Sequence, residues 1–289
     1  MINFFDTLSL RVLDRAIKVQ CEDKESWTLL TAAYGEMRDE IETAHLNYTA
    51  GRQRGTGAFF LKRKGEEPQL ALDDGEFLFF FEKEITIELQ KLRPDLYFVH
   101  GAVLEFRGKA LMLVGASGSG KSTTTWALLH HGFRYLSDEL APVDLTTLEV
   151  YPYPHALCLK NEPPASYPLP LKTNRTSRTL HVPVGALPGG VATAALPLIA
   201  IFFLRYRSER PVTTIEPISQ AAAAARLIAN ALNPLAHPGY GLDAAVEMAS
   251  RTACFEIFRG DLHETSALVK DTTTRVVSSS GQRWRSGLK

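Results

Sequence analysis

The stretch GASGSGKSTTT, Gly115–Thr125, decides the fold of the region around it. It matches the pattern G-x-x-x-x-G-K-[ST], in which glycine-rich backbone surrounds phosphate groups, at every position. An apolar run, ALMLVG at 110–115, precedes it. A helical pattern, KSTTTWALLHH at 121–131, follows it, with Gly132 placed to end the helix. Strand, loop and helix therefore succeed one another in the order that a phosphate-binding loop requires.

Each residue type in the loop suits the binding of phosphate or metal. Glycines allow unusual backbone angles and leave the inward-pointing N–H groups uncovered. Lys121 supplies a mobile charge for the β- and γ-phosphates, and the Ser122 hydroxyl can bind Mg²⁺. We therefore expect ATP and Mg²⁺ as ligands. The predicted nucleotide-binding residues are Gly115, Ala116, Ser117, Gly118, Ser119, Gly120, Lys121, Ser122 and Thr123.

The loop alone does not separate the classes of nucleotide-binding protein. Transporter-type ATPases have the same loop sequence pattern, but they also need an LSGGQ-like signature followed by an apolar strand that ends in an acid. The nearest match, SSSGQ at 278–282, has no such strand after it. A small GTPase would need an NKxD segment, which the sequence lacks. Both classes are therefore disfavoured.

Three residues outside the loop complete a candidate site. Asp138 follows Ser122 by 16 residues, at the end of the next predicted strand, FRYLSDE at 133–139. Neighbouring strands can bring Ser122 and Asp138 to one Mg²⁺ ion, and Glu139 could hold a second metal or take the proton of an attacking hydroxyl. His100 precedes Gly115 by 15 residues and would lie near the phosphates if its strand pairs with 110–115 across a turn at 107–109.

Composition bounds the remaining possibilities. The chain of 289 residues is 45% apolar and carries 32 basic and 32 acidic residues. It therefore has no overall positive charge of the kind that would indicate a nucleic-acid partner. Its three cysteines are far apart, which disfavours a disulfide framework or a zinc site. No signal peptide is apparent, and the longest apolar run, 194–204, is too short to span a bilayer. We expect a cytoplasmic protein without a membrane partner.

The first 95 residues carry no chemical motif. We expect a mixed α/β region there that is a candidate for binding substrate. Leu8, Val12, Leu13 and Ile17 fit one helical face or a curved strand, and the pattern leaves both open. The segments expected to form strands are 57–63, 76–84, 96–106, 110–115, 196–207 and 252–259, and those expected to form helices are 82–92, 121–131, 219–233 and 261–270. The phosphate-loop domain is expected over 96–270, and the Ser/Thr/Arg-rich residues 271–289 are expected to be disordered.

Three segments together, HGAVLEF at 100–106, GASGSGKS at 115–122 and LSDE at 136–139, resemble the kinase domain of HPr kinase/phosphorylase and its relatives. The resemblance continues weakly through CLKN at 158–161. It implies the mixed α/β fold of the HPr kinase and phosphoenolpyruvate carboxykinase group, with a mixed sheet instead of the parallel sheet of ordinary phosphate-loop ATPases. Relatives also form hexamers, which implies a homo-oligomer.

The resemblance also implies roles. By position, the expected catalytic residues are His100, Lys121, Asp138 and Glu139, and the expected metal ligands are Ser122, Asp138 and Glu139. The acids and the histidine would assist proton transfer at the acceptor hydroxyl. Lys160 is a weaker candidate for contacting phosphate or substrate, and it also fits a solvated lysine at a strand end.

The sequence departs from typical HPr kinases in ways that disfavour HPr as acceptor. Thr123 stands where they have Glu, Glu139 stands where they have Asp, and the later glycine-rich signature used for dephosphorylation is absent. The pattern is instead similar to divergent members that phosphorylate peptides, such as lasso-peptide serine kinases. We therefore expect a kinase acting on a serine of a peptide or protein. The alternatives are a kinase of a small-molecule hydroxyl and an ATP-binding sensor or chaperone with slow or no hydrolysis.

Overall fold

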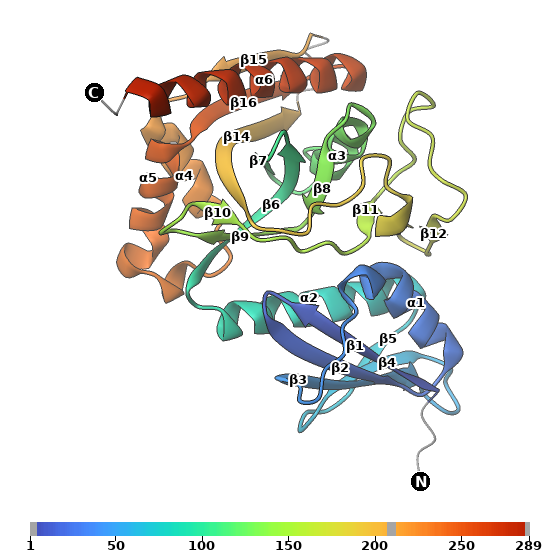
Figure 1. Ribbon diagram of the computed structural model, residues 1–289. Helices are drawn as coiled ribbons and strands as arrows, with labels where there is room; N and C mark the ends of the chain where they lie inside the picture. Colours follow the sequence, from blue (N-terminus) through green and yellow to red (C-terminus); the bar gives the residue numbers. More distant parts are fainter. Residues whose placement is uncertain (1–4, 207–211, 287–289) are drawn as a thin grey trace. The chain divides into compact units, whose positions relative to one another are not determined.

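A computed structural model describes residues 5–206 and 212–286 and divides the chain into two compact units (Figure 1). The first contains Met1–Arg93 and Pro154–Ala186, and the second contains Pro94–Tyr153 and Leu187–Lys289. The sequence suggested one domain over 96–270. The structure instead groups Pro154–Ala186 with the N-terminal residues.

The first unit contains a five-stranded sheet in the order β1-β2-β3-β4-β5, in which only β2 and β3 run parallel. Its elements are β1 (Asp6–Val12), β2 (Arg15–Cys21), α1 (Lys24–Tyr34), η1 (Gly35–Met37), β3 (Leu46–Arg52), β4 (Phe59–Arg63), β5 (Gln69–Ala71) and α2 (Asp74–Leu92). The pattern that left helix and strand open at Leu8 to Ile17 is therefore a hairpin. The strand expected at 57–63 is confirmed as β4.

The strand expected at 76–84 is wrong, because these residues form the first half of α2. Phe77, Phe81 and Ile85 recur every fourth residue and are fully buried, which is the spacing of one helical face. Asp73 fixes the start of the helix, since its side chain accepts a hydrogen bond from the Glu76 N–H at 2.7 Å. Capping and burial therefore outweigh the β preference of the aromatic run.

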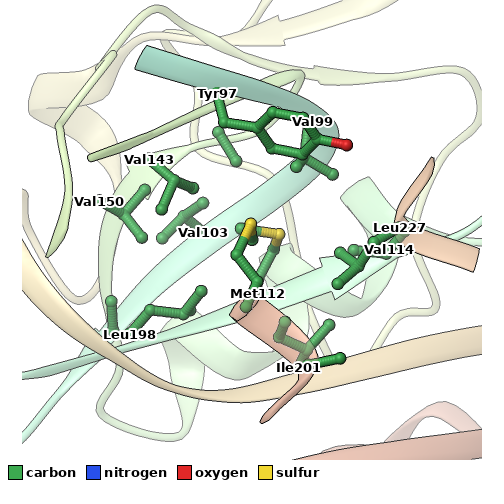
Figure 2. Packing of buried hydrophobic residues seen from close by; sticks show 14 of the residues in the cluster. Tyr97, Val99, Val103, Met112, Val114, Val143, Val150, Leu198, Ile201 and Leu227 are labelled. Carbon is green, nitrogen blue, oxygen red and sulfur yellow. The ribbon is translucent and has the colours of Figure 1, made fainter. Parts of the chain in front are cut away.

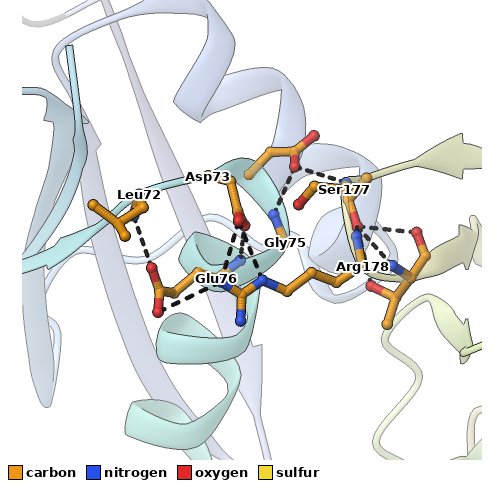
Figure 3. Close-up of polar contacts among 9 residues, drawn as sticks. Leu72, Asp73, Gly75, Glu76, Ser177 and Arg178 are labelled. Carbon is orange, nitrogen blue, oxygen red and sulfur yellow. Dashed lines mark hydrogen bonds and ion pairs between the residues drawn. The ribbon is translucent and has the colours of Figure 1, made fainter.

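The segment Pro154–Ala186 folds into a three-stranded sheet with the order β11-β13-β12. Its elements are β11 (Leu157–Leu159), β12 (Asn174–Arg175), β13 (Leu180–Val182) and η2 (Val184–Ala186). Figure 3 shows how it joins α2: the Arg178 guanidinium donates to Asp73 at 3.1 and 3.2 Å, and the Ser177 N–H donates to Asp74 at 3.1 Å. These contacts explain why the segment belongs to the first unit.

The second unit is built on an eight-stranded mixed sheet with the order β10-β9-β6-β7-β14-β16-β15, in which β8 also pairs with β6. Pairing is parallel between β7 and β14 and between β14 and β16, and antiparallel between β6 and its partners. The strands are β6 (Leu96–Phe106), β7 (Lys109–Val114), β8 (Arg134–Ser137), β9 (Leu140–Asp144), β10 (Glu149–Val150), β14 (Leu196–Tyr206), β15 (Thr214–Pro217) and β16 (Ala253–Arg259). The fold is thus mixed α/β with mixed sheets.

Helices cover both faces of this sheet. They are α3 (Lys121–His130), α4 (Gln220–Ala229), η3 (Pro234–Ala236), η4 (Pro238–Gly241), α5 (Leu242–Arg251) and α6 (Leu262–Ser286). Side chains of β6, β7 and β14 pack with α4 and α5 in one buried cluster (Figure 2), which includes Val99, Met112, Ile201 and Leu227. Because strand side chains alternate, the intervening residues point toward the face on which α3 and α6 pack.

The disorder expected from Asp271 onward is wrong for the residues that the structure describes, because α6 continues to Ser286. Hydroxyls of Thr265, Ser266 and Thr273 each donate to the carbonyl four residues earlier, and all three residues are buried. Residues 287–289 of that expected tail, and Arg207 of the expected strand 196–207, lie outside the described residues. No helix within the described part of the chain is both long and apolar enough to cross a bilayer.

Candidate active site

The loop Gly115–Gly120 connects β7 to α3, and its glycines meet two steric demands. A Cβ on Gly115 would lie 2.8 Å from the carbonyl oxygen of Leu204 and 2.7 Å from Oγ of Ser119, so a larger residue would not fit there. Gly118 and Gly120 have φ angles of 83° and 92°, in the left-handed region that favours glycine. The loop thus presents backbone at the start of α3 with few side chains in the way.

Lys121, the first residue of α3, folds back over the loop. Its side chain is buried, and Nζ donates a hydrogen bond to the Gly115 carbonyl at 2.7 Å. Nζ also lies 3.1 Å from Nε2 of His100. The ammonium group is therefore held between the beginning of the loop and the neighbouring strand, where it adds a full charge to the positive end of the helix dipole.

His100 reaches this position because β6 and β7 form an antiparallel hairpin. Gly101 pairs with Val114, which places His100 beside Gly115. On its other side His100 pairs with Leu140 of β9. His100 alternates with Val99 of the α4–α5 cluster, so its ring lies on the face that carries α3. The strand pairing expected across 107–109 is confirmed.

Asp138 and Glu139 lie where one strand is interrupted. β8 and β9 both pair with β6. Ser137 pairs with Val103 and Leu140 pairs with His100, so the register against β6 is the same on both sides of the two unpaired acids. Asp138 is fully buried, whereas the Glu139 side chain is 36% exposed and its Oε2 lies 3.3 Å from Nδ1 of His100. The break in the strand therefore places two adjacent carboxylates in different environments, and only that of Glu139 has a described contact with His100.

The two contacts of His100 suit one tautomer. A Lys121 ammonium can only donate to Nε2, which leaves the proton of a neutral ring on Nδ1, 3.3 Å from Oε2 of Glu139. A chain of polar contacts thus runs from the Gly115 carbonyl through Lys121 and His100 to Glu139. The structure brings these predicted site residues together.

Ser119 and Asp138 carry polar groups of the types that bind phosphate and divalent cations. The Ser119 hydroxyl is buried against Gly115 and has no hydrogen-bond partner among the described residues. A fully buried carboxylate such as Asp138 is stable only beside donors or a cation, and carboxylate and hydroxyl oxygens are the ligand type that Mg²⁺ prefers. Of the predicted metal ligands, Asp138 is fully buried and Ser122 is half-buried in the first turn of α3. The described residues contain no group of three or more His, Cys, Asp and Glu side chains suited to a metal ion.

Other predicted residues contribute less. Ala116 and Ser117 are exposed in the loop, and Thr123 is half-buried in the first turn of α3. Lys160 is exposed after β11 and belongs to the first unit.

One residue near the loop is not part of the predicted site. Arg259, at the end of β16, lies so close to Gly120 that a Cβ there would be 2.9 Å from the Arg259 Cζ atom. The phosphate-loop pattern involves no residue so far along the chain. The only signal in the sequence is that Arg259 ends a predicted strand.

No protein-family model matches the chain, and no curated protein matches it. Among solved structures, the HPr(Ser) kinase/phosphatase from Coxiella burnetii aligns with 65% of this chain and 98% of its own, at 12% identity and a TM-score of 0.31. Because this score is low, the likeness establishes neither a shared fold family nor a shared activity.

Proposed function

We propose that the chain is an ATP- and Mg²⁺-dependent kinase that transfers the γ-phosphoryl group to a serine hydroxyl of a peptide or protein. The observation that carries the proposal is the chain of polar contacts from the phosphate loop through Lys121 and His100 to the carboxylate of Glu139. A site built only to bind nucleotide has no need of a base linked to its phosphate-binding lysine.

The loop would hold ATP through its backbone N–H groups, with Lys121 turning from the Gly115 carbonyl toward the β- and γ-phosphates. Ser122 and Asp138 would hold Mg²⁺, which neutralises phosphate charge when bound. Since Lys121 then keeps its contact with His100, the histidine ring stays oriented with Nδ1–H toward Glu139.

The transfer step needs one base. The acceptor oxygen forms a bond to the γ-phosphorus while the bond from that phosphorus to the β–γ bridging oxygen breaks, leaving ADP. The hydroxyl proton passes to the Glu139 carboxylate, and His100 keeps that carboxylate in place through its contact with Oε2 at 3.3 Å. Glu139 suits this role better than Asp138, because Asp138 is fully buried and the Glu139 side chain is 36% exposed.

Exposure also supports a macromolecular acceptor. The side chains of His100 and Glu139 are 31% and 36% exposed, so a hydroxyl carried on a peptide can approach them from solvent. Thr123 and Glu139 differ from the residues of typical HPr kinases at these positions, which favours an acceptor other than HPr.

The test is incubation of the purified protein with γ-labelled ATP, Mg²⁺ and a peptide fraction from its own cells. We expect label on serine of a peptide, and a loss of at least about a hundredfold in the Lys121→Ala variant. Label on a small molecule would identify a metabolite kinase, and label only in free phosphate would identify an ATPase or sensor. Full transfer by Lys121→Ala would refute the proposed site.

A further inference from the structure

One basic side chain approaches the phosphate loop from a distant strand. Arg259 is the last residue of β16, and its guanidinium covers Gly120, the residue that precedes α3. The first N–H groups of a helix have no partner within the helix and point out of its start. The guanidinium therefore lies beside the backbone donors that the proposed function assigns to ATP phosphates.

The backbone around Arg259 is fixed. Arg259 pairs with Tyr206 of the parallel strand β14, the Gly260 N–H donates to Oγ1 of Thr213 at 3.1 Å, and Asp261 caps α6 by accepting from the Glu264 N–H at 3.0 Å. Because β7, β14 and β16 run parallel, Arg259 ends at the same edge of the sheet as the loop. This is the edge at which open α/β sheets bind ligands.

Three sources of positive charge converge there: the Lys121 ammonium, the Arg259 guanidinium and the start of α3. They repel one another unless an anion lies among them. The described first turn of α3 contains no acidic residue. The triphosphate of ATP would add negative charge where these positive groups converge.

We propose that Arg259 is a second cation that binds the phosphate groups of the nucleotide, across the loop from Lys121. This inference rests on the proposed function, in which ATP occupies the loop. The planar guanidinium can donate two parallel hydrogen bonds to phosphate oxygens, which an ammonium group cannot do. Glycine is then required at position 120 for two reasons. Its φ is 92°, and a Cβ there would overlap the Arg259 guanidinium.

The test is calorimetric titration of the full-length protein with Mg-ATP and with AMP. We expect Arg259→Gln to weaken Mg-ATP binding by about tenfold to a hundredfold, the range for lost hydrogen bonds between charged groups, and to affect AMP less. The affinity of Arg259→Lys for Mg-ATP should lie between those of the wild type and Arg259→Gln. Lysine keeps the positive charge but cannot donate two parallel hydrogen bonds. Arg107→Gln removes one exposed charge from the β6–β7 turn and should leave binding unchanged.

Each contrary result has a distinct meaning. If the wild type binds Mg-ATP and Arg259→Gln binds it equally well, the role of Arg259 is wrong and the proposed function stands. Equal losses for Mg-ATP and AMP would assign Arg259 a structural role and overturn the inference. If the wild type binds no Mg-ATP, both proposals fail. Should Arg259→Gln not fold, unchanged affinity in Arg259→Lys would overturn the bidentate contact.

Discussion

Two helices of this chain, α2 and α3, begin in opposite ways. At the start of α2, Asp73 caps the Glu76 N–H, the first turn holds Asp74 and Glu76, and Arg178 neutralises the surplus charge. At the start of α3, Gly120 offers no side-chain cap and the described first turn holds no acid. The first helix thus satisfies its own N-terminus, whereas the described start of the second has neither a side-chain cap nor an acid.

The difference explains why two similar local structures have different roles. A helix start carries about half a positive charge, and side chains, water or a ligand can satisfy its free N–H groups. In α2 the chain itself supplies the negative partner, in Asp73 and the acids of the first turn. Their attraction to the helix start stabilises the first unit. In α3 the chain places Lys121 and Arg259 there instead, which raises the positive potential and suits a polyphosphate.

Giving α3 an acid should remove this difference and produce the largest effect. We expect Ser122→Asp to weaken Mg-ATP binding by at least about a hundredfold, because the carboxylate repels phosphate and competes for the same N–H groups. Titration calorimetry measures it. Ser122→Ala is the control, since it removes the hydroxyl without adding charge and should retain more binding. Equal affinity in Ser122→Asp and wild type would mean that the phosphates bind elsewhere.

Acid should weaken the first unit through two buried histidines. Burial lowers the pKa of His155 to about 3 and the pKa of His181 to about 4. The unfolded chain binds these protons below about pH 6.5 and the folded chain does not, so the free energy of unfolding falls as pH drops through this window. Between pH 6.5 and 5 we expect a loss of up to about 2 kcal/mol for each histidine.

Urea unfolding at several pH values checks this expectation. His181→Gln can keep a hydrogen bond to Thr179 and should show a smaller loss of stability on acidification than wild type. Parallel pH profiles for the two proteins would show that His181 does not contribute.

Removing the cap of α2 should have the smallest effect. We expect Asp73→Ala to cost about 1–2 kcal/mol of unfolding free energy, since the Glu76 N–H and Arg178 both lose their acceptor. Asp73→Asn keeps a capping oxygen and should cost less. Both variants should bind Mg-ATP like wild type. Unchanged stability in Asp73→Ala would show that α2 does not depend on its cap.

Sequence patterns could predict the neighbourhood of the loop because its contacts are short in sequence. The turn at 107–109 sets the register that brings His100 to Gly115, and an apolar strand followed by Gly-rich backbone and a helical pattern has few other solutions. Arg259 could not be predicted in the same way. Its place beside Gly120 depends on two parallel pairings, β7 with β14 and β14 with β16, which no local signal specifies.

Two errors had local causes. The aromatic run of α2 has no polar residue to reveal a helical period, although Asp73 and Glu76 carry the spacing of a helix cap. The Ser/Thr/Arg content from Asp271 onward suggested disorder, but the hydroxyls of Thr273 and Thr274 donate hydrogen bonds to carbonyls of their own helix.

The most direct test of the central claim compares Glu139→Gln with wild type for two properties of the same samples. These are the affinity for Mg-ATP and the initial rate of phosphoryl transfer to a serine peptide. The substitution keeps an oxygen that can accept from His100 but removes the base. We expect unchanged affinity for Mg-ATP and a transfer rate lower by about a hundredfold or more. An unchanged rate, or a wild type that binds Mg-ATP without phosphorylating any acceptor, would contradict it.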